Sequence, residues 1–307
     1  MNNFIKMIKE ICDEEQIKCT NLSKDWVIML EKNNKTRFIS GYKFDLNNHA
    51  LGNIIDDKYA LYEIFSSKKI PIIEHNIVFS PTNGNSYAKG ANTYQIVYEY
   101  FQNHSQGIVL KSNNGTCGTE VFHIKKEKDI KPILDKLFFK NFSISMCPFY
   151  DIKTEYRLIV LNKECRLMYG KKRPVVIGDG KSTIKKLLID FNPRYFNTRL
   201  EEPKYSKILK SKELYEYGWQ FNLSQGSIPI EIKYSKTQKT LLKIAKDITN
   251  EIDFGFGSID IIETKDHEFM VMELNSGVMM ENYIEIRKEE YNKAKQIYRD
   301  AIKEFFK

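Results

Sequence analysis

The spacing of apolar and polar residues predicts helices and strands in a mixed order. Apolar residues at helical spacing predict helices over 4–11, 56–70, 92–104, 129–139, 183–191, 235–252 and 285–306. Short apolar or alternating runs predict strands over 26–30, 36–40, 71–81, 106–112, 120–124, 143–150, 155–162, 164–173, 174–178, 258–262 and 268–275. This order lacks a regular strand–helix alternation, so we expect an α+β fold with helices on antiparallel sheets.

Within the predicted helix 235–252, Leu241, Leu242, Ala245 and Ile248 form one apolar stripe. The first 55 residues look too small for a complete domain, whereas 307 residues suggest about two domains. The span 193–225 is polar and irregular, and we expect a loop with short helices there. Its residues 219–222 either close over a substrate or form a surface excursion.

Composition indicates a globular protein, with 42% apolar and 29% charged residues. No apolar run approaches the roughly 18 residues that span a bilayer, so we expect no membrane segment. The first 16 residues carry acidic side chains and do not resemble a signal peptide. The five cysteines lack metal-binding spacing, so we expect free thiols and a cytoplasmic location.

The charge is positive but dispersed. The chain has 48 basic and 40 acidic side chains, a net charge of +8, and no block of five consecutive basic residues. This distribution favours a lysine-rich solubilising surface over a nucleic-acid footprint. Anionic small molecules remain candidate ligands, because a positive cleft concentrates them.

Two neighbouring strands near the C-terminal end carry a candidate metal site. A tight hairpin around Lys265 and Asp266 would pair Ile259 with Met272 and Asp260 with Val271. In that register Met270, Met272 and Leu274 face the core, and Asp260, Glu273 and Asn275 share the opposite face with Phe269 and Val271. Oxygen-bearing side chains among apolar neighbours suit Mg²⁺. The alternative is the solvent-facing half of an amphipathic hairpin.

Two further segments suggest phosphate binding. Lys111 ends an apolar strand directly before a loop that contains Gly115 and Gly118, whose backbone N–H groups could surround phosphate oxygens. A simple glycine turn is the alternative. The stretch GDGKST, residues 178–183, reads as a turn that enters a helix, and a basic cluster at residues 171–173 precedes it.

The order of these segments resembles the ATP-grasp ligases, in particular cyanophycin synthetase, glutathione synthetase and the ribosomal-protein glutamate ligases. The segments that carry the resemblance are Asp57-Lys58 at a helix start, IVLKSNNGTCGTEV, TEYRLIV, KKRPVVIGDGKSTIKKLL and GSIDII…MVMELNSG. NSGVMM lacks the proline that follows the metal-binding asparagine in the family, and Cys147-Pro148-Phe149 replaces a common hinge glutamate.

The resemblance implies a role for each matching residue. Nucleotide phosphates would contact Lys58 and Lys111, beneath a lid that includes Gly115, Thr116, Gly118 and Thr119. Adenine would lie against the hinge residues Met146, Cys147 and Phe149, and the ribose against Asp151. Catalytic charge neutralisation would come from Lys111, Arg157 and Arg173. Asp260, Glu273 and Asn275 match the Mg²⁺ ligands of the family, in agreement with the hairpin argument, and Mn²⁺ is the alternative metal.

The activity implied is ATP- and Mg²⁺-dependent joining of a carboxylate to an amine through an acyl phosphate, on an amino acid or a peptide. The implied architecture is an ATP-grasp fold with a shortened N-terminal region at 1–55, a first subdomain at 56–148 and a second at 149–307. The alternatives are a kinase-like phosphotransferase and a non-catalytic nucleotide- or nucleic-acid-binding module. The sequence leaves the oligomeric state open between a monomer and a homodimer.

Overall fold

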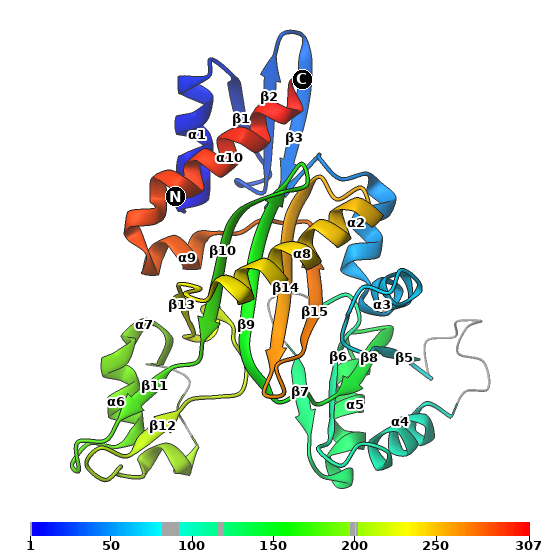
Figure 1. Ribbon diagram of the computed structural model, residues 1–307, viewed down its shortest axis with the longest axis vertical. Coiled ribbons are helices and arrows are strands. Elements are labelled where there is room, and N and C mark those ends of the chain that lie inside the picture. Colours follow the sequence, from blue (N-terminus) through cyan, green and yellow to red (C-terminus); the bar gives the residue numbers. More distant parts are fainter. Residues whose placement is uncertain (1, 82–91, 116–119, 197–199, 201) are drawn as a thin grey trace.

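The computed structural model describes residues 2–81, 92–115, 120–196, 200 and 202–307. Figure 1 shows a large central sheet with a smaller sheet above it and two smaller α/β units below it. All the named strand pairs within these sheets are antiparallel, as the sequence predicts.

The N-terminal unit is a helix packed on one face of a four-stranded meander. Its elements are α1 (Asn3–Glu14), β1 (Lys18–Leu22), β2 (Val27–Lys32), β3 (Lys35–Ser40) and β4 (Lys43–Phe44), and the strand order is β1-β2-β3-β4. The side chain of Asn2 caps α1 by accepting a hydrogen bond from the backbone N–H of Ile5. Helix α1 starts one residue before the predicted helix 4–11 and ends three residues after it, and strands β1 and β4 were not predicted.

The central sheet has the strand order β13-β10-β9-β14-β15. Its strands are β9 (Ile152–Leu161), β10 (Glu164–Lys172), β13 (Ile228–Ile230), β14 (Phe256–Thr264) and β15 (Phe269–Asn275). Helix α8 (Ser235–Glu251) crosses one face in Figure 1, and α2 (His49–Asp56) and α3 (Lys58–Ser67) contribute to the same core. The buried stripe of α8 contains Ile244, and Leu242 is 40% exposed, so the predicted stripe was wrong at that position.

The first of the two lower units contains the sheet β5-β8-β6-β7 and two helices. Its elements are β5 (Asn76–Phe79), α4 (Thr93–Gln102), β6 (Ile108–Ser112), β7 (Val121–Ile124), α5 (Ile130–Phe138) and β8 (Ser143–Pro148). The observed strand β5 is shorter than the predicted strand 71–81, because the residues before β5 pair with β15 of the central sheet. Ile72 forms an isolated bridge with Val271, and the N–H of Ile73 donates to the carbonyl of Val271 at 3.0 Å.

The other lower unit is a small excursion between β10 and β13. It contains β11 (Val175–Ile177), α6 (Ile184–Phe191), α7 (Pro193–Phe196) and β12 (Leu214–Glu216) around its own apolar cluster. Asp179 stabilises the predicted turn by accepting hydrogen bonds from the backbone N–H groups of Lys181 and Ser182. Thr183 then caps α6 by accepting from the N–H of Lys186.

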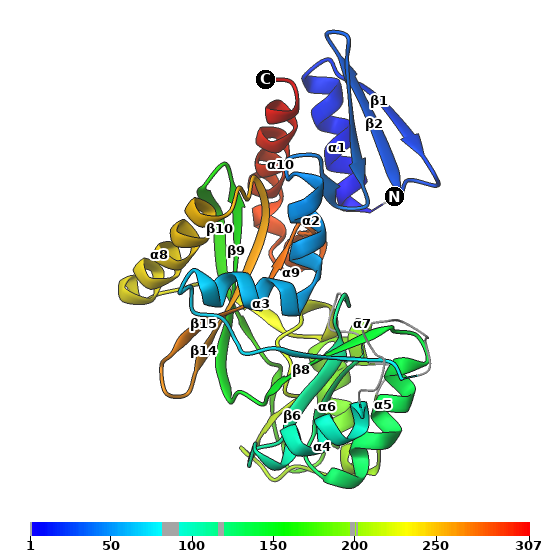
Figure 2. The same ribbon diagram turned by 90° about the vertical axis from the view of Figure 1, so that its right-hand side faces the viewer.

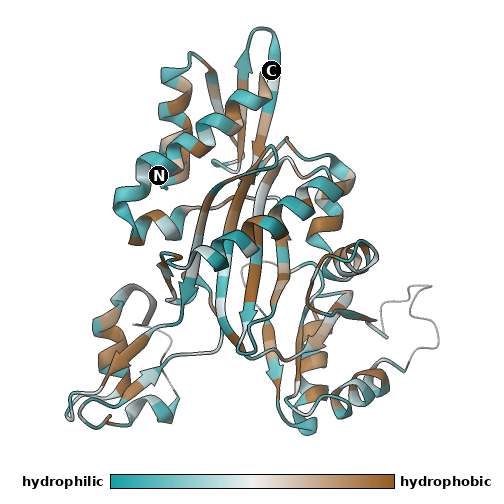
Figure 3. Cartoon of the chain, in the orientation of Figure 1, coloured by the Kyte–Doolittle hydropathy of each residue, from teal (hydrophilic) through white to brown (hydrophobic). Residues whose placement is uncertain are grey.

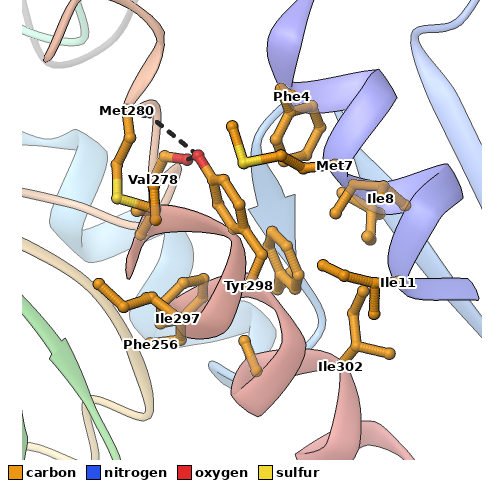
Figure 4. Close-up of a cluster of buried hydrophobic side chains, with 14 of the residues drawn as sticks. Phe4, Met7, Ile8, Ile11, Phe256, Val278, Met280, Ile297, Tyr298 and Ile302 are labelled. Atoms are coloured by element: carbon orange, nitrogen blue, oxygen red, sulfur yellow. Dashed lines mark hydrogen bonds between the residues drawn. The ribbon is translucent and has the colours of Figure 1, made fainter. Parts of the chain in front are cut away.

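The C-terminal part returns to the N-terminal unit. The predicted helix 285–306 is instead two helices, α9 (Glu281–Ile286) and α10 (Tyr291–Phe305), because the backbone leaves the helical region at Arg287. Figure 4 shows Tyr298 of α10 buried between α1 and the segment before α9. Its hydroxyl accepts from the N–H of Met280 at 3.2 Å and donates to the carbonyl of Val278 at 2.9 Å. One core therefore joins both ends of the chain.

Hydropathy follows this arrangement. In Figure 3, apolar colours run along the central strands and polar colours cover the outward faces of the helices. Across the part of the chain that the structure describes, no helix is both long enough and apolar enough to cross a membrane.

Candidate active site

The site begins where one face of the central sheet changes from apolar to charged. Along β9, Leu161 and Ile159 belong to the core shared with α1 and α10, and Arg157 and Glu155 follow at alternate positions. Strand pairing aligns Arg157 with Tyr169 of β10 on one side. On the other side it aligns Arg157 with Asp260 of β14. On this face of the central sheet, the apolar core therefore ends at a row of polar side chains that runs across the strands.

Asp260 is the centre of this row. The carboxylate is fully buried and accepts hydrogen bonds from the Arg157 Nε at 2.9 Å and Nη2 at 2.6 Å. It also accepts from the Lys171 Nζ at 3.0 Å. Lys171 is itself 4% exposed and forms a second ion pair with Glu155. A buried carboxylate with two cationic partners holds three strands of the sheet together at this point.

The electrostatics of the cluster follow from burial and these partners. Burial alone would raise the pKa of Asp260, but Arg157 first and Lys171 second hold that pKa at about 2. Burial raises the pKa of Glu155 to about 7, against the opposing effect of Lys171. Asp260 is therefore the carboxylate whose negative charge offsets the charges of both Arg157 and Lys171.

The hairpin of β14 and β15 brings Asp260 and Glu273 directly opposite each other. The predicted register was wrong, because the turn is longer than a tight two-residue turn and a bulge lies between Asp260 and Ile261. The observed pairs are Ile259 with Leu274, Asp260 with Glu273, and Ile261 with Val271.

The bulge interrupts the alternation of side chains at Met272. Val271 consequently joins the apolar core beneath α8, and Met272 lines the cavity beside Glu273. The sequence pattern predicted Met272 on the core face and Val271 on the face of Glu273, and both predictions were wrong. Asp260, Glu273 and Asn275 are nevertheless observed on one face of the hairpin. The extra residue Met272 shifts the alternation of side chains by one position, so that Glu273 lies on the same face as Asp260.

These three side chains together could hold a cation. The amide nitrogen of Asn275 donates to Asp260 at 3.2 Å and to Glu273 at 3.4 Å, so its amide oxygen is the atom that can bind a metal. Two carboxylates and one amide oxygen suit Mg²⁺, which takes few protein ligands. No group of three or more His, Cys, Asp and Glu side chains that could hold a metal occurs among the described residues. Asp260 can ligate only by exchanging one of its present partners.

Lys58 reaches the site from the N-terminus of α3. The Asp57 side chain caps this helix by accepting from the N–H of Ala60 at 2.8 Å, which fixes Lys58 in the first turn. The Lys58 Nζ donates to the carbonyls of Asn113 at 3.0 Å and Gly115 at 2.6 Å. The Asp-Lys pair therefore connects α3 to the loop that follows Lys111.

Lys111 lies on β6 and is 8% exposed. Its cross-strand neighbour Ser145 makes a 2.7 Å hydrogen bond with the ring of His75. Burial, followed by the charges of Lys111 and Lys58, holds the pKa of His75 well below its usual value. The ring of His75 is therefore neutral and adds no positive charge near Lys111.

A cavity of about 750 Å³ separates the two lysines from the charged row. Its walls come from the N-terminal unit, both sheets and the segment after β12. The proposed site residues that line it are Lys58, Lys111, Gly115, Arg157, Glu273 and Asn275. Residues 219–224 line it as well. Lys58 and Lys111 thus share one cavity with Glu273 and Asn275, although Lys111 and Glu273 are 162 residues apart, and Asp260 lies buried behind this wall.

The other predicted site residues that the structure describes, like Asp260, do not line this cavity. Met146 is part of the core of the first lower unit, and Cys147 beside it is buried. The Phe149 ring stacks on His123 with centroids 3.6 Å apart. Asp151 forms an ion pair with Lys265 at 2.6 Å, and Arg173 pairs with Glu216. Thr116, Gly118 and Thr119 lie outside the described residues.

Three residues of the charged face were not predicted as site residues from the sequence. Glu155 lies two positions before Arg157, so it shares a strand face that was already singled out. Tyr169 and Lys171 pair with Arg157 and Glu155 across β10. Strand alternation could have found Glu155, whereas Tyr169 and Lys171 required the register of β9 and β10.

Comparisons with known proteins bear on the fold. No protein-family model matches the chain. The glutathione biosynthesis bifunctional protein GshAB of Lactiplantibacillus plantarum is 25% identical over 161 residues, a match that covers 51% of this chain and 19% of that protein. The chain thus spans less than two thirds of that relative.

Two solved structures have similar folds. A bifunctional glutathione synthetase from Pasteurella multocida has a TM-score of 0.50 at 15% identity, and the match covers 89% of this chain and 39% of that one. The D-cycloserine synthetase DcsG has a TM-score of 0.51 at 10% identity, over 83% of this chain and 73% of that one. These likenesses confirm the predicted α+β ATP-grasp fold.

The geometry predicts that Asp260 carries more of the stability than Glu273. In metal-free protein, Asp260→Asn leaves the buried charge of Arg157 without its carboxylate partner and leaves Lys171 with Glu155 alone, so we expect a loss of about 3–5 kcal/mol in the free energy of unfolding. Glu273→Gln, on the same row, should cost about 1 kcal/mol or less. Urea unfolding in the presence of a chelator measures both values. Equal losses in the two variants would contradict the described role of Asp260.

Proposed function

We propose that the protein is an ATP- and Mg²⁺-dependent ligase that joins a carboxylate to an amine through an acyl phosphate. The observation that carries the proposal is the shared cavity, in which Lys58 and Lys111 face Arg157, Glu273 and Asn275. The ATP-grasp fold and the similarity to glutathione-synthesising proteins support it. In the same proposal, residues 56–148 and 149–307 are the two nucleotide-binding subdomains and residues 1–55 are an accessory N-terminal region.

The division of roles follows from the position of each charge. Lys58 and Lys111 supply positive charge for the nucleotide phosphates from one side of the cavity. Arg157 supplies it from the other side, where its guanidinium is fixed in orientation by Asp260. Phosphoryl transfer depends mainly on positioning and electrostatic stabilisation, so this arrangement needs no nucleophilic side chain.

Glu273 and Asn275 would hold Mg²⁺, with Asp260 as a third donor once it releases one present partner. When bound, Mg²⁺ would offset negative charge on the phosphate oxygens. Met272, Val121 and Ile152 also line the cavity, and they offer apolar surface for the adenine ring near the hinge. Residues 219–224 form a wall that would limit access of water to an acyl phosphate.

The direct test is release of ADP and phosphate with pairs of carboxylates and amines. We expect release to require both substrates, Mg²⁺ and ATP. Lys111→Met and Glu273→Gln should each lower kcat by at least about 100-fold, because each removes charge stabilisation of the transferred phosphate. Circular dichroism checks that each variant remains folded.

Lys186→Met on α6 and Glu268→Gln before β15 are matched controls, because both original side chains are exposed and neither lines the cavity. They should retain wild-type rates. AMP release would refute the acyl-phosphate route, and a stable phosphorylated product formed without an amine would identify a phosphotransferase. Unchanged turnover in folded Lys111→Met and Glu273→Gln would refute the site.

The nucleotide affinity should depend on pH through Lys58. Burial, with a further contribution from Lys111, lowers the pKa of Lys58 to about 8, although Glu273, Asp56 and Asp57 favour the charged form. Bound nucleotide phosphates would favour the protonated form of Lys58. Nucleotide binding above pH 8 must therefore be accompanied by the uptake of a proton. Affinity for a non-hydrolysable ATP analogue should therefore fall as the pH rises above about 8, by up to about tenfold per unit.

Calorimetry at pH 9 in two buffers with different ionisation enthalpies measures this proton uptake. The matched control is Lys58→Arg, which keeps the positive charge at all pH values used. It should bind the analogue without the uptake seen in the wild type. Proton uptake of the same size in Lys58→Arg would show that another group titrates.

A further inference from the structure

The cavity continues beyond the charged row toward the N-terminal unit. At this end its lining comes from Trp26, Ser40, Tyr42, Ser276 and Tyr283. None of these residues has a role in holding the nucleotide in the proposed function. The end of the cavity nearest the N-terminal sheet thus offers aromatic and hydroxyl groups, together with Lys43, which is paired with Asp56.

Trp26 is an exposed aromatic residue with a fixed position. Its side chain is 62% exposed, yet its ring lies directly over the backbone of Gly41. A Cβ atom at residue 41 would lie 2.9 Å from the Trp26 Cη2, and the φ angle of +59° also favours glycine there. The N–H of Gly41 donates to the carbonyl of Trp26 at 2.7 Å. The indole is therefore held in place at the cavity edge without being buried.

Ser276 provides a polar atom at the same end of the cavity. The residue is 5% exposed, and within the described part of the chain its Oγ has no hydrogen-bond partner. A buried hydroxyl without a partner is costly, so a group that supplies one is favoured. Because Ser276 follows the proposed metal ligand Asn275, that group would lie beside the reacting atoms.

The outer face of the N-terminal sheet continues from this end of the cavity. Strand pairing places two rows of side chains on that face, namely Leu22, Val27 and Ser40, and Thr20, Met29 and Phe38. Leu22 and Phe38 are exposed, whereas Ile28, Leu30 and Ile39 on the other face are buried against α1. In Figure 2, α1 lies against one face of the sheet, and no described element covers the other. Ser40 belongs both to this face and to the cavity lining.

The composition of the face indicates what would cover it. Each row holds two apolar side chains and one hydroxyl group at its end, which suits a peptide whose side chains are apolar and whose amide groups need hydrogen-bond partners. A hydrocarbon chain would leave the hydroxyl groups of Thr20 and Ser40 without partners. A second copy of the chain would cover the face without entering the cavity, so it would leave the Ser276 hydroxyl unmatched.

We propose that the ligase substrate at this end is an extended peptide with apolar side chains, which runs from Ser276 past Trp26 onto the outer face of β1, β2 and β3. Trp26 is its specificity-determining residue. This inference rests on the proposed function for the identity of the reaction, but peptide binding can be measured without ATP.

Fluorescence of the two tryptophans of the chain tests the proposal. Trp219→Phe leaves Trp26 as the only tryptophan. We expect a saturable change in its emission with a hexapeptide of alternating valine and serine, and none with a hexapeptide of alternating glycine and serine or with free valine. The double substitution Leu22→Ser and Phe38→Ser should weaken valine–serine peptide binding about tenfold, because it removes two exposed apolar contacts.

The matched control is the double substitution Ile177→Ser and Leu214→Ser. These two residues are also exposed and apolar, and they lie opposite each other on β11 and β12 in the excursion between β10 and β13. Peptide binding should be unchanged in this control. An equal loss of binding in both double variants, or a Trp26 response to the glycine–serine peptide, would overturn the proposal.

Two further outcomes separate the subsite from the reaction. If Leu22→Ser with Phe38→Ser converts a dimer to a monomer in sedimentation and leaves peptide binding intact, the face is an interface between copies and the proposal is wrong. If ADP is released with free amino acids and Trp26→Ala leaves the KM for peptides unchanged, the ligase function stands and the subsite fails. If the peptide binds at Trp26 but no substrate pair releases ADP, the subsite stands and the ligase function fails.

Discussion

The ion pairs of Asp260 with Arg157 and Lys171 determine the geometry of the site. They lie where the apolar face of the central sheet ends, and they connect β9, β10 and β14 through one buried carboxylate. Burying three charges is costly unless each is paired, so the arrangement constrains the register of all three strands. The orientation of Arg157 and the placement of Glu273 both depend on that register.

The same cluster explains how a cavity of charged residues can adjoin a well-packed core. Above the row, alternate residues of β9 pack against α1 and α10; below it, the same face supplies Arg157 and Glu155. The other face of the sheet remains apolar beneath α8. The sheet thus serves both as a core element and as one wall of the cavity, and the first lower unit supplies the opposing lysine.

Local patterns in the sequence predict much of this structure. Hydrophobic spacing located α3, α4, α8 and the strands from β8 to β11, and the family resemblance placed Asp57-Lys58 at the start of a helix, where α3 begins. The fold class also follows from the order of elements, and the comparisons confirm it. The roles assigned to individual site residues remain predictions.

The errors arose where long-range packing overrides local pattern. A bulge beside Met272 reversed the faces of Val271 and Met272, and no local signal marks it. The segment before β5 pairs with Val271 of β15 instead of extending the strand. Lys171 was visible only as part of a basic cluster, because its partners Glu155 and Asp260 are brought to it by strand pairing.

The most direct test of the central claim is a crystal structure with Mn²⁺ and a non-hydrolysable ATP analogue, in which anomalous scattering locates the metal. The account predicts a metal peak within coordination distance of the Glu273 carboxylate and the Asn275 amide oxygen, with the analogue's phosphates between this peak and Lys111. A metal bound away from Glu273, or a nucleotide bound outside the cavity, would contradict it.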